Sequence, residues 1–152
     1  MPVRISLLLG FLGQSARRRR LLLEALLWLG LARMALRFIS FRYIVWFLKR
    51  PVKETKLTAI ERGVLRQEVS WAVGESALHL PGVTACFPCG IAARTMLRRR
   101  GIDATLYYGA ATLPDRGLTT HVWVQDGLDG VVGHQVADNY HVIARYPEEQ
   151  GI

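Results

Sequence analysis

The sequence has little cysteine, no long uncharged apolar run and, in its first third, almost no acidic residues. Two cysteines among 152 residues cannot form a disulfide framework for a chain of this length. The apolar run at residues 5–12 is followed by four arginines, Arg17 to Arg20, instead of a signal-peptide cleavage site. We therefore expect a reducing compartment and a cytoplasmic protein. No internal repeat or low-complexity tract occurs, and this length suits one domain with one core.

The acidic residues are scarce where the basic residues gather. Residues 1–53 carry eleven Lys and Arg but only one acid, Glu24, whereas residues 54–152 carry nine Lys and Arg and eleven Asp and Glu. A basic arm can meet nucleic acid, an anionic membrane surface or an acidic peptide. This arm is rich in leucine and does not alternate its basic residues with exposed aromatics, so we expect no nucleic-acid partner.

Residues 21–46 are apolar enough to raise the question of a membrane span. Glu24, Arg33, Arg37 and Arg42 interrupt the stretch, whereas a spanning helix needs about 20 apolar residues with almost no charge. We expect a helix that packs under the fold or against a partner, and peripheral membrane contact stays open as an alternative.

Helical signals fill the first two thirds of the chain. We expect one or two helices between Arg17 and Leu48, a polar break at 51–56, and a helix that begins at Thr58, because Thr58 and Glu61 have capping-box spacing. A loop is predicted at 74–83. These signals divide the chain into a basic, apolar helical segment (1–56) and a core (57–152), expected to fold as one unit.

The remaining third combines one well-marked helix with strands. Pro88 suits the first turn of a helix that starts at Cys86, and Gly101 is a natural residue just past its end. Strands are predicted at 104–108, 119–125 and 131–136, with a loop at 110–118. Helices followed by an antiparallel sheet indicate an α+β fold.

Cys86 and His121 form the candidate reactive pair. Free backbone N–H groups and the helix dipole favour a thiolate at a helix N-terminus. A histidine on a rigid strand can accept the thiol proton. A cysteine and a histidine that are distant in sequence are the arrangement expected of papain-type and transglutaminase-type sites, which the fold assembles.

Three other interpretations of the same residues stay open at this point. Cys86 and His121 can be ordinary buried or hydrogen-bonded side chains. Cys86 and Cys89 form a Cys-x-Pro-Cys motif typical of thiol oxidoreductases. Two cysteines together with His121 and His134 could ligate zinc, although their spacing is not that of a zinc finger.

Longer strings around this pair resemble one family. The residues that carry the resemblance are Cys86-Phe87, Gly90-Ile91-Ala92-Ala93, Met96 to Ala104, Leu106, Gly109 and Thr120-His121-Val122-Trp123-Val124. They resemble the lasso-peptide maturation proteases, a transglutaminase-like family, over about residues 20–147. The resemblance implies a papain- or transglutaminase-like core, with the nucleophilic cysteine at a helix N-terminus packed on an antiparallel sheet.

The resemblance also implies a function. The chain would be a cysteine protease that removes the leader of a ribosomally made precursor peptide, with Cys86 as nucleophile and His121 as base, without a metal or organic cofactor. An ATP-dependent cyclase would then close the ring. Because no separate precursor-recognition domain precedes the catalytic part, a small leader-binding protein would deliver the substrate.

The sequence departs from the family at the residue that orients the histidine. The family usually has an aspartate about a dozen residues after the histidine, but here Gly133, His134 or Gln135 is expected beside His121, and Asp138 lies further on. A histidine, a glutamine or a backbone carbonyl would then orient His121, or the site would work as a dyad. A non-catalytic scaffold of the maturation complex and a thiol oxidoreductase are the alternative functions.

Overall fold

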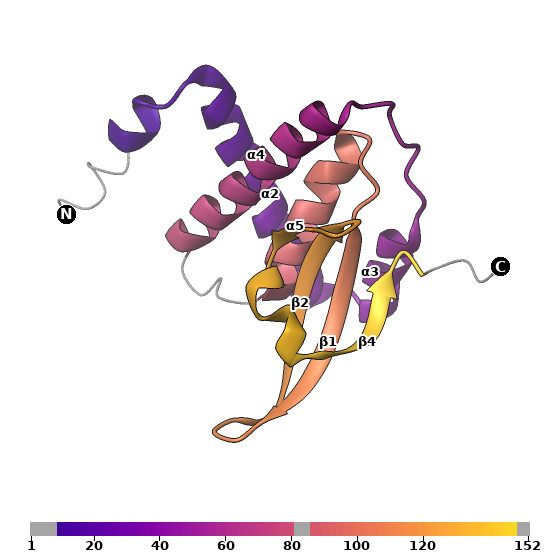
Figure 1. The fold of residues 1–152 in the computed structure, drawn as a ribbon. Coiled ribbons are helices and arrows are strands. Elements are labelled where there is room, and N and C mark those ends of the chain that lie inside the picture. The colour runs from indigo at the N-terminus through magenta and orange to yellow at the C-terminus, as the bar shows by residue number, and fades with distance from the viewer. Residues whose placement is uncertain (1–8, 81–85, 149–152) are drawn as a thin grey trace.

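The computed structural model describes residues 9–80 and 86–148 (Figure 1). After a helical stretch at residues 9–12, the helices α2 (Ala16–Phe38), α3 (Phe41–Lys49), α4 (Ala59–His79) and α5 (Cys86–Arg99) precede the sheet. The remaining elements are β1 (Thr105–Leu113), β2 (Gly117–Asp126), β3 (Asp129–Val132), the 3₁₀ helix η1 (His134–Asn139) and β4 (His141–Tyr146). The predicted α+β class is confirmed.

Helix α4 begins as the sequence predicts and ends later. The Thr58 hydroxyl accepts from the Glu61 amide, and the Glu61 carboxylate accepts from the Thr58 amide, which completes the capping box. The loop predicted from residue 74 is wrong up to His79, because the helix continues through Gly74 and buries Val73 and Ser76 on either side of it. That packing outweighs the cost of one helical glycine, about 1 kcal/mol. Residues 81–83 of the predicted loop lie outside the described residues.

Helix α5 ends in a Schellman motif at the predicted glycine. Gly101 has φ +74°, its amide donates to the Arg98 carbonyl, and the Ile102 amide donates to the Leu97 carbonyl. A left-handed conformation is available to glycine without strain. The turn directs the chain into β1, which runs back antiparallel to the helix.

The strands form one antiparallel sheet in the order β3-β2-β1-β4. The β1–β2 hairpin is longer than predicted, since Leu113 pairs with Gly117 where a loop over 110–118 was expected. The strand predicted at 131–136 ends at Val132, because Gly133 has φ +70° and turns the chain into η1. Strand β4 was not predicted; it pairs with β1.

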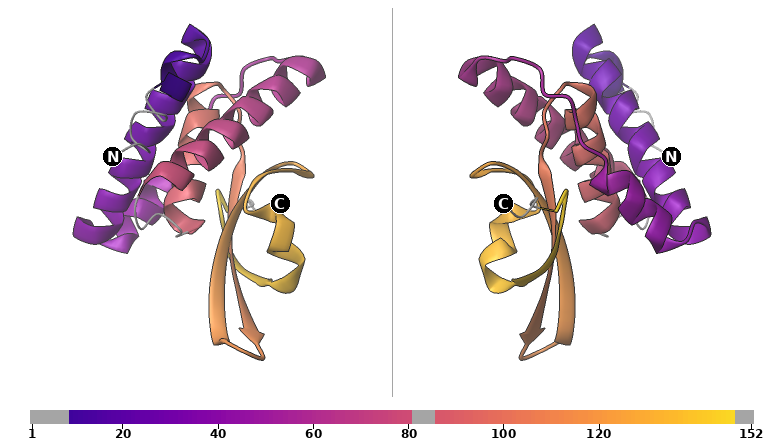
Figure 2. Two further views of the ribbon diagram at one scale, coloured as in Figure 1. Left: turned by 90° about the vertical axis from the view of Figure 1, so that its left-hand side faces the viewer. Right: turned by 90° about the vertical axis from the view of Figure 1, so that its right-hand side faces the viewer.

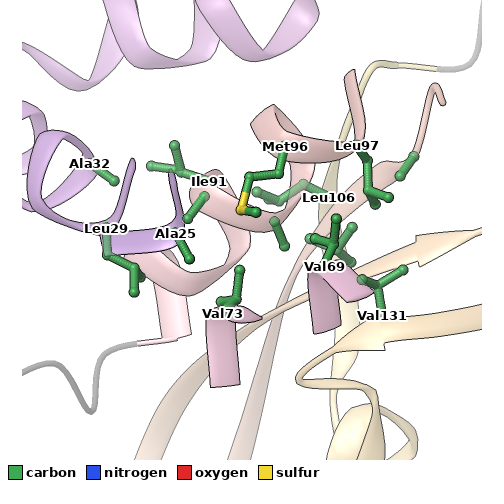
Figure 3. Packing of buried hydrophobic residues seen from close by; sticks show 14 of the residues in the cluster. Ala25, Leu29, Ala32, Val69, Val73, Ile91, Met96, Leu97, Leu106 and Val131 are labelled. Carbon is green, nitrogen blue, oxygen red and sulfur yellow. The ribbon is translucent and has the colours of Figure 1, made fainter. Parts of the chain in front are cut away.

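The helices and η1 cover opposite faces of the sheet (Figure 2). Helices α2, α4 and α5 stack on one face, and their shared cluster includes Leu29, Val69 and Met96 (Figure 3). This cluster joins residues from both sides of the predicted boundary at residue 56; the division into two segments stays a prediction. Among the described helices, none combines the length and apolar character needed to cross a bilayer.

Candidate active site

Cys86 is the first residue of α5 and lines a cavity of about 310 Å³. Helix α4 supplies one wall, the end of β3 supplies the other, and Val122 of β2 forms part of the floor. The thiol is half-buried and free. Backbone N–H groups in the first turn of a helix lack intrahelical partners, so the first turn of α5 places N–H donors near this sulfur.

Gly90 sets how closely α5 approaches the sheet. A Cβ added there would come within 2.7 Å of Val122 Cγ1 and 3.2 Å of Leu106 Cδ1. Only a glycine therefore lets the first turns of α5 lie directly on β1 and β2. The same contact shows that Val122 projects from the face of β2 that α5 covers.

His121 projects from the other face of β2. Its ring stacks on that of Trp123, at a centroid distance of 6.0 Å, and contacts the Tyr140 ring at 5.2 Å. Trp123 lies two residues along the strand, and Tyr140 directly follows η1, which covers the face opposite to α5 (Figure 2). The imidazole is half-buried there.

The Gly133 carbonyl orients the imidazole. His121 Nε2 lies 2.7 Å from this oxygen. Because a carbonyl oxygen only accepts, Nε2 donates and carries the proton. In the neutral ring Nδ1 is then the basic nitrogen. A backbone carbonyl was one of the orienting groups that the sequence left open.

The other candidate orienting residues lie elsewhere. A Cβ on Gly130 would collide with the His134 ring, so that ring packs over Gly130. Gln135 lines the Cys86 cavity, and Asp138 is exposed on η1. None of the three has a hydrogen bond to His121 within the described part of the chain.

Gly133 lies close to both Cys86 and His121, although the described residues show no hydrogen bond between these two side chains. Gly133 lines the Cys86 cavity and also accepts the hydrogen bond from His121. Over residues 9–80 and 86–148 no hydrogen bond links the Cys86 sulfur to the His121 ring, and His121 does not line that cavity. The reactive pair is therefore not assembled in this conformation.

An open strand edge lies between the two side chains. Strand β3 pairs with β2 only as far as Val132, opposite Val124. Beyond that point no strand of the described residues pairs with the outer edge of β2 near His121. Gly133 and Gln135, which follow β3, reach the Cys86 cavity. The barrier between thiol and imidazole is the Gly133 turn at this edge.

Cys89 shares the cavity with Cys86. Burial raises the pKa of the Cys89 thiol, and the neighbouring Cys86 adds to the effect. Cys89 is therefore held in its protonated form. The described residues contain no cluster of three or more His, Cys, Asp or Glu side chains that could hold a metal ion, so they give the zinc interpretation no support.

A carboxylate clamp holds α4 against the sheet beside this cavity. Asp126, at the end of β2, accepts two hydrogen bonds from Arg62, at 2.7 and 2.8 Å, and one from Arg66 at 2.8 Å. Burial by itself raises the pKa of Asp126, but the two guanidinium groups outweigh it and hold this pKa below its ordinary value. The clamp was not predicted from the sequence, although Arg62 and Arg66 have the spacing of one helix face.

A scan against protein-family models matches residues 26–145 to the family described as transglutaminase-like superfamily. The chain belongs to the transglutaminase-like superfamily. No curated protein and no solved structure matches it. The match begins within α2, ends within β4 and includes both Cys86 and His121. Membership confirms the expected superfamily and α+β fold, and it supports chemistry of the cysteine-protease type.

Proposed function

We propose that this transglutaminase-like protein is a cysteine protease that removes the leader peptide from a ribosomally made lasso-peptide precursor. The observation that carries the proposal is the position of Cys86 at the start of α5, facing a cavity, within a chain of this superfamily. The motifs around Cys86 and His121 support the narrower substrate class.

In the proposed reaction Cys86 attacks the carbonyl carbon of the scissile peptide bond. Backbone N–H groups in the first turn of α5 donate to the oxygen that becomes negative. His121 Nδ1 takes the thiol proton and gives it to the leaving amine. Water then hydrolyses the thioester, which releases the leader with a free carboxylate and regenerates the thiol.

The pair must close before this reaction can occur. His121 has to swing around the open edge of β2, which requires the turn at Gly133 to move away from the cavity. The Gly133 carbonyl is a single hydrogen-bond partner, worth about 1 kcal/mol, so substrate or partner binding can supply the energy. We assign this closure to the arrival of the precursor with its leader-binding protein.

The outer face of α2 and α3 is our proposed docking surface for that leader-binding protein. Leu27, Leu31, Met34 and Phe38 form an exposed stripe along α2, with the three- and four-residue steps of a helix–helix seam. Beside it, α3 and α2 enclose an apolar groove of about 280 Å³ whose floor includes Ile91 of α5. An occupant would therefore contact the helix that carries Cys86.

The charge of this surface indicates the chemistry of its occupant. Residues 16–50 carry nine Lys and Arg and one acid, Glu24. That acid is bound by Arg100, whose two terminal nitrogens lie 3.0 and 2.7 Å from its oxygens. An acidic segment that presents large apolar side chains is complementary to the face. An anionic bilayer is the competing occupant, which vesicle binding distinguishes from binding of the purified leader-binding protein.

The proposed function is tested by cleavage of a lasso-peptide precursor, with its leader-binding protein present and mass spectrometry as the readout. Wild-type protein and Cys89→Ala should release the leader, and Cys86→Ala should not. His121→Gln should slow cleavage about 10²–10⁴-fold, because the amide can donate to Gly133 but cannot act as a base. The matched control His134→Gln should leave the rate within a few fold.

The unassembled pair favours a second candidate function. A non-catalytic scaffold that holds the leader-binding protein and the ATP-dependent cyclase together would need no contact between Cys86 and His121. It predicts that Cys86→Ala supports full lasso-peptide production in cells, whereas a charge introduced on the docking surface, such as Leu31→Glu, abolishes production. The protease predicts loss of production for both variants.

A further inference from the structure

The two cysteines occupy one turn of α5 and one cavity. Cys86 is the first residue of the helix and Cys89 lies three residues later. Both thiols are free and half-buried, and both line the same cavity between α4 and the end of β3. The protease mechanism uses only Cys86, so the role of Cys89 is unassigned.

Helix geometry places this pair within disulfide range. With 1.5 Å rise and 3.6 residues per turn, Cα atoms three residues apart lie about 5 Å from each other. Disulfides span Cα separations of roughly 4.4–6.8 Å.

The surroundings assign different roles to the two sulfurs. We assign the first attack to Cys86, which is the first residue of α5 and lines the cavity. Cys89 lies deeper in the turn and burial raises its pKa, so it reacts poorly with an external oxidant. Cys89 instead lies where it can attack the neighbouring Cys86 sulfur, because closeness to that sulfur compensates for the low reactivity of the Cys89 thiol.

We propose that Cys86 and Cys89 form a reversible disulfide that removes the nucleophile and switches the protein off under oxidation. The oxidant is a low-molecular-weight disulfide such as oxidised glutathione. The Cys86 thiolate attacks one of its sulfurs, the S–S bond breaks, and one glutathione thiol leaves. Cys89 then loses its proton and attacks the Cys86 sulfur, which releases the second thiol. Two protein thiols are oxidised and one external disulfide is reduced to two thiols.

The disulfide itself is tested without any activity assay. The purified full chain is equilibrated in glutathione buffers of increasing oxidised fraction, quenched in acid and measured by intact mass and maleimide labelling. Wild-type protein should lose two hydrogen atoms in mass and both reactive thiols. Cys89→Ser, which lacks the resolving sulfur, should accumulate a glutathione adduct on Cys86. A wild-type chain that accumulates the same adduct, or that keeps both thiols free in the most oxidised buffer, overturns the proposal.

The effect on cleavage rests on the proposed function and separates the two proposals. Oxidised wild-type protein should lose precursor cleavage and regain it fully with dithiothreitol. Disulfide formation in a chain that never cleaves the precursor refutes the protease and leaves the redox pair standing. Cleavage that depends on Cys86 without any disulfide refutes the redox pair and leaves the protease standing.

Discussion

Removing the charge of Asp126 should loosen the wall of the Cys86 cavity. Asp126→Asn preserves the shape of the side chain but leaves two guanidinium groups without their shared carboxylate. The Asp126 side chain is 4% exposed, whereas those of Arg62 and Arg66 are 26% and 20% exposed. Breaking a buried ion pair costs about 3–5 kcal/mol. Arg62 and Arg66 are only half-buried and keep Glu54 and Asp129 as partners, so we expect about 3 kcal/mol.

Thermal unfolding followed by circular dichroism measures this cost directly. For a chain of this size, about 3 kcal/mol lowers Tm by roughly 6–12 °C. Because the folded-state pKa of Asp126 is lowered, its stabilisation is fully present above the unfolded-state pKa of about 4 and disappears as pH falls through the folded-state pKa. The gap between wild type and variant should therefore be constant near neutral pH and close in acid.

A matched control is Asp115→Asn, at an exposed position in the β1–β2 turn. Its Tm should stay within about 2 °C of wild type, since surface substitutions of this kind change stability little. The reasoning is refuted if Asp126→Asn shifts Tm no more than Asp115→Asn does, or if the gap between wild type and Asp126→Asn persists unchanged in strong acid.

Three further predictions concern glycines, two that position the site and one in α2 for contrast. Gly133→Ala should destabilise the protein by about 1–2 kcal/mol, because φ is +70° and the new Cβ would lie 2.6 Å from the Val122 carbonyl oxygen. Nitrogen NMR of the His121 imidazole should also show that the fixed Nε2–H tautomer is lost. An unchanged spectrum contradicts the orienting role of the Gly133 carbonyl. Gly90→Ala should cost about 1–3 kcal/mol in urea unfolding, because α5 must move off Val122; a variant as stable as wild type would show that the close approach of α5 is unimportant. Gly30→Ala in α2 is the contrasting case: nothing lies within 4 Å of the new Cβ, so stability should rise by about 0.5–1 kcal/mol, and a loss would contradict the packing described for α2.

Local signals in the sequence were sufficient for the helix ends and for the fold class. The capping box at Thr58 and the left-handed Gly101 depend on contacts within a few residues, and the structure confirms both. The extent of α4 was wrong because burial of Val73 and Ser76 against other elements decides it. A lone glycine could not reveal that packing.

The sheet edge was the hardest part to predict, because long-range pairing determines it. Strand β4 forms only by pairing with β1, and its first three residues are exposed, so it lacks an alternating pattern. The sequence indicated Cys86 and His121 as residue types but not the faces on which they lie. Side chains alternate between the two faces of β2, so His121 points away from α5 because Val122 points towards it. This is apparent only in the folded structure, where α5 packs on the sheet at Gly90.

The covalent intermediate on Cys86 provides the most direct test of the central claim. Precursor, leader-binding protein and the purified chain are mixed, quenched in acid during the first turnover and measured by intact mass. We expect a thioester between Cys86 and the leader, located by peptide mapping, in the wild type and in Cys89→Ala but not in Cys86→Ala. Cleavage by Cys86→Ala at the wild-type rate would contradict it.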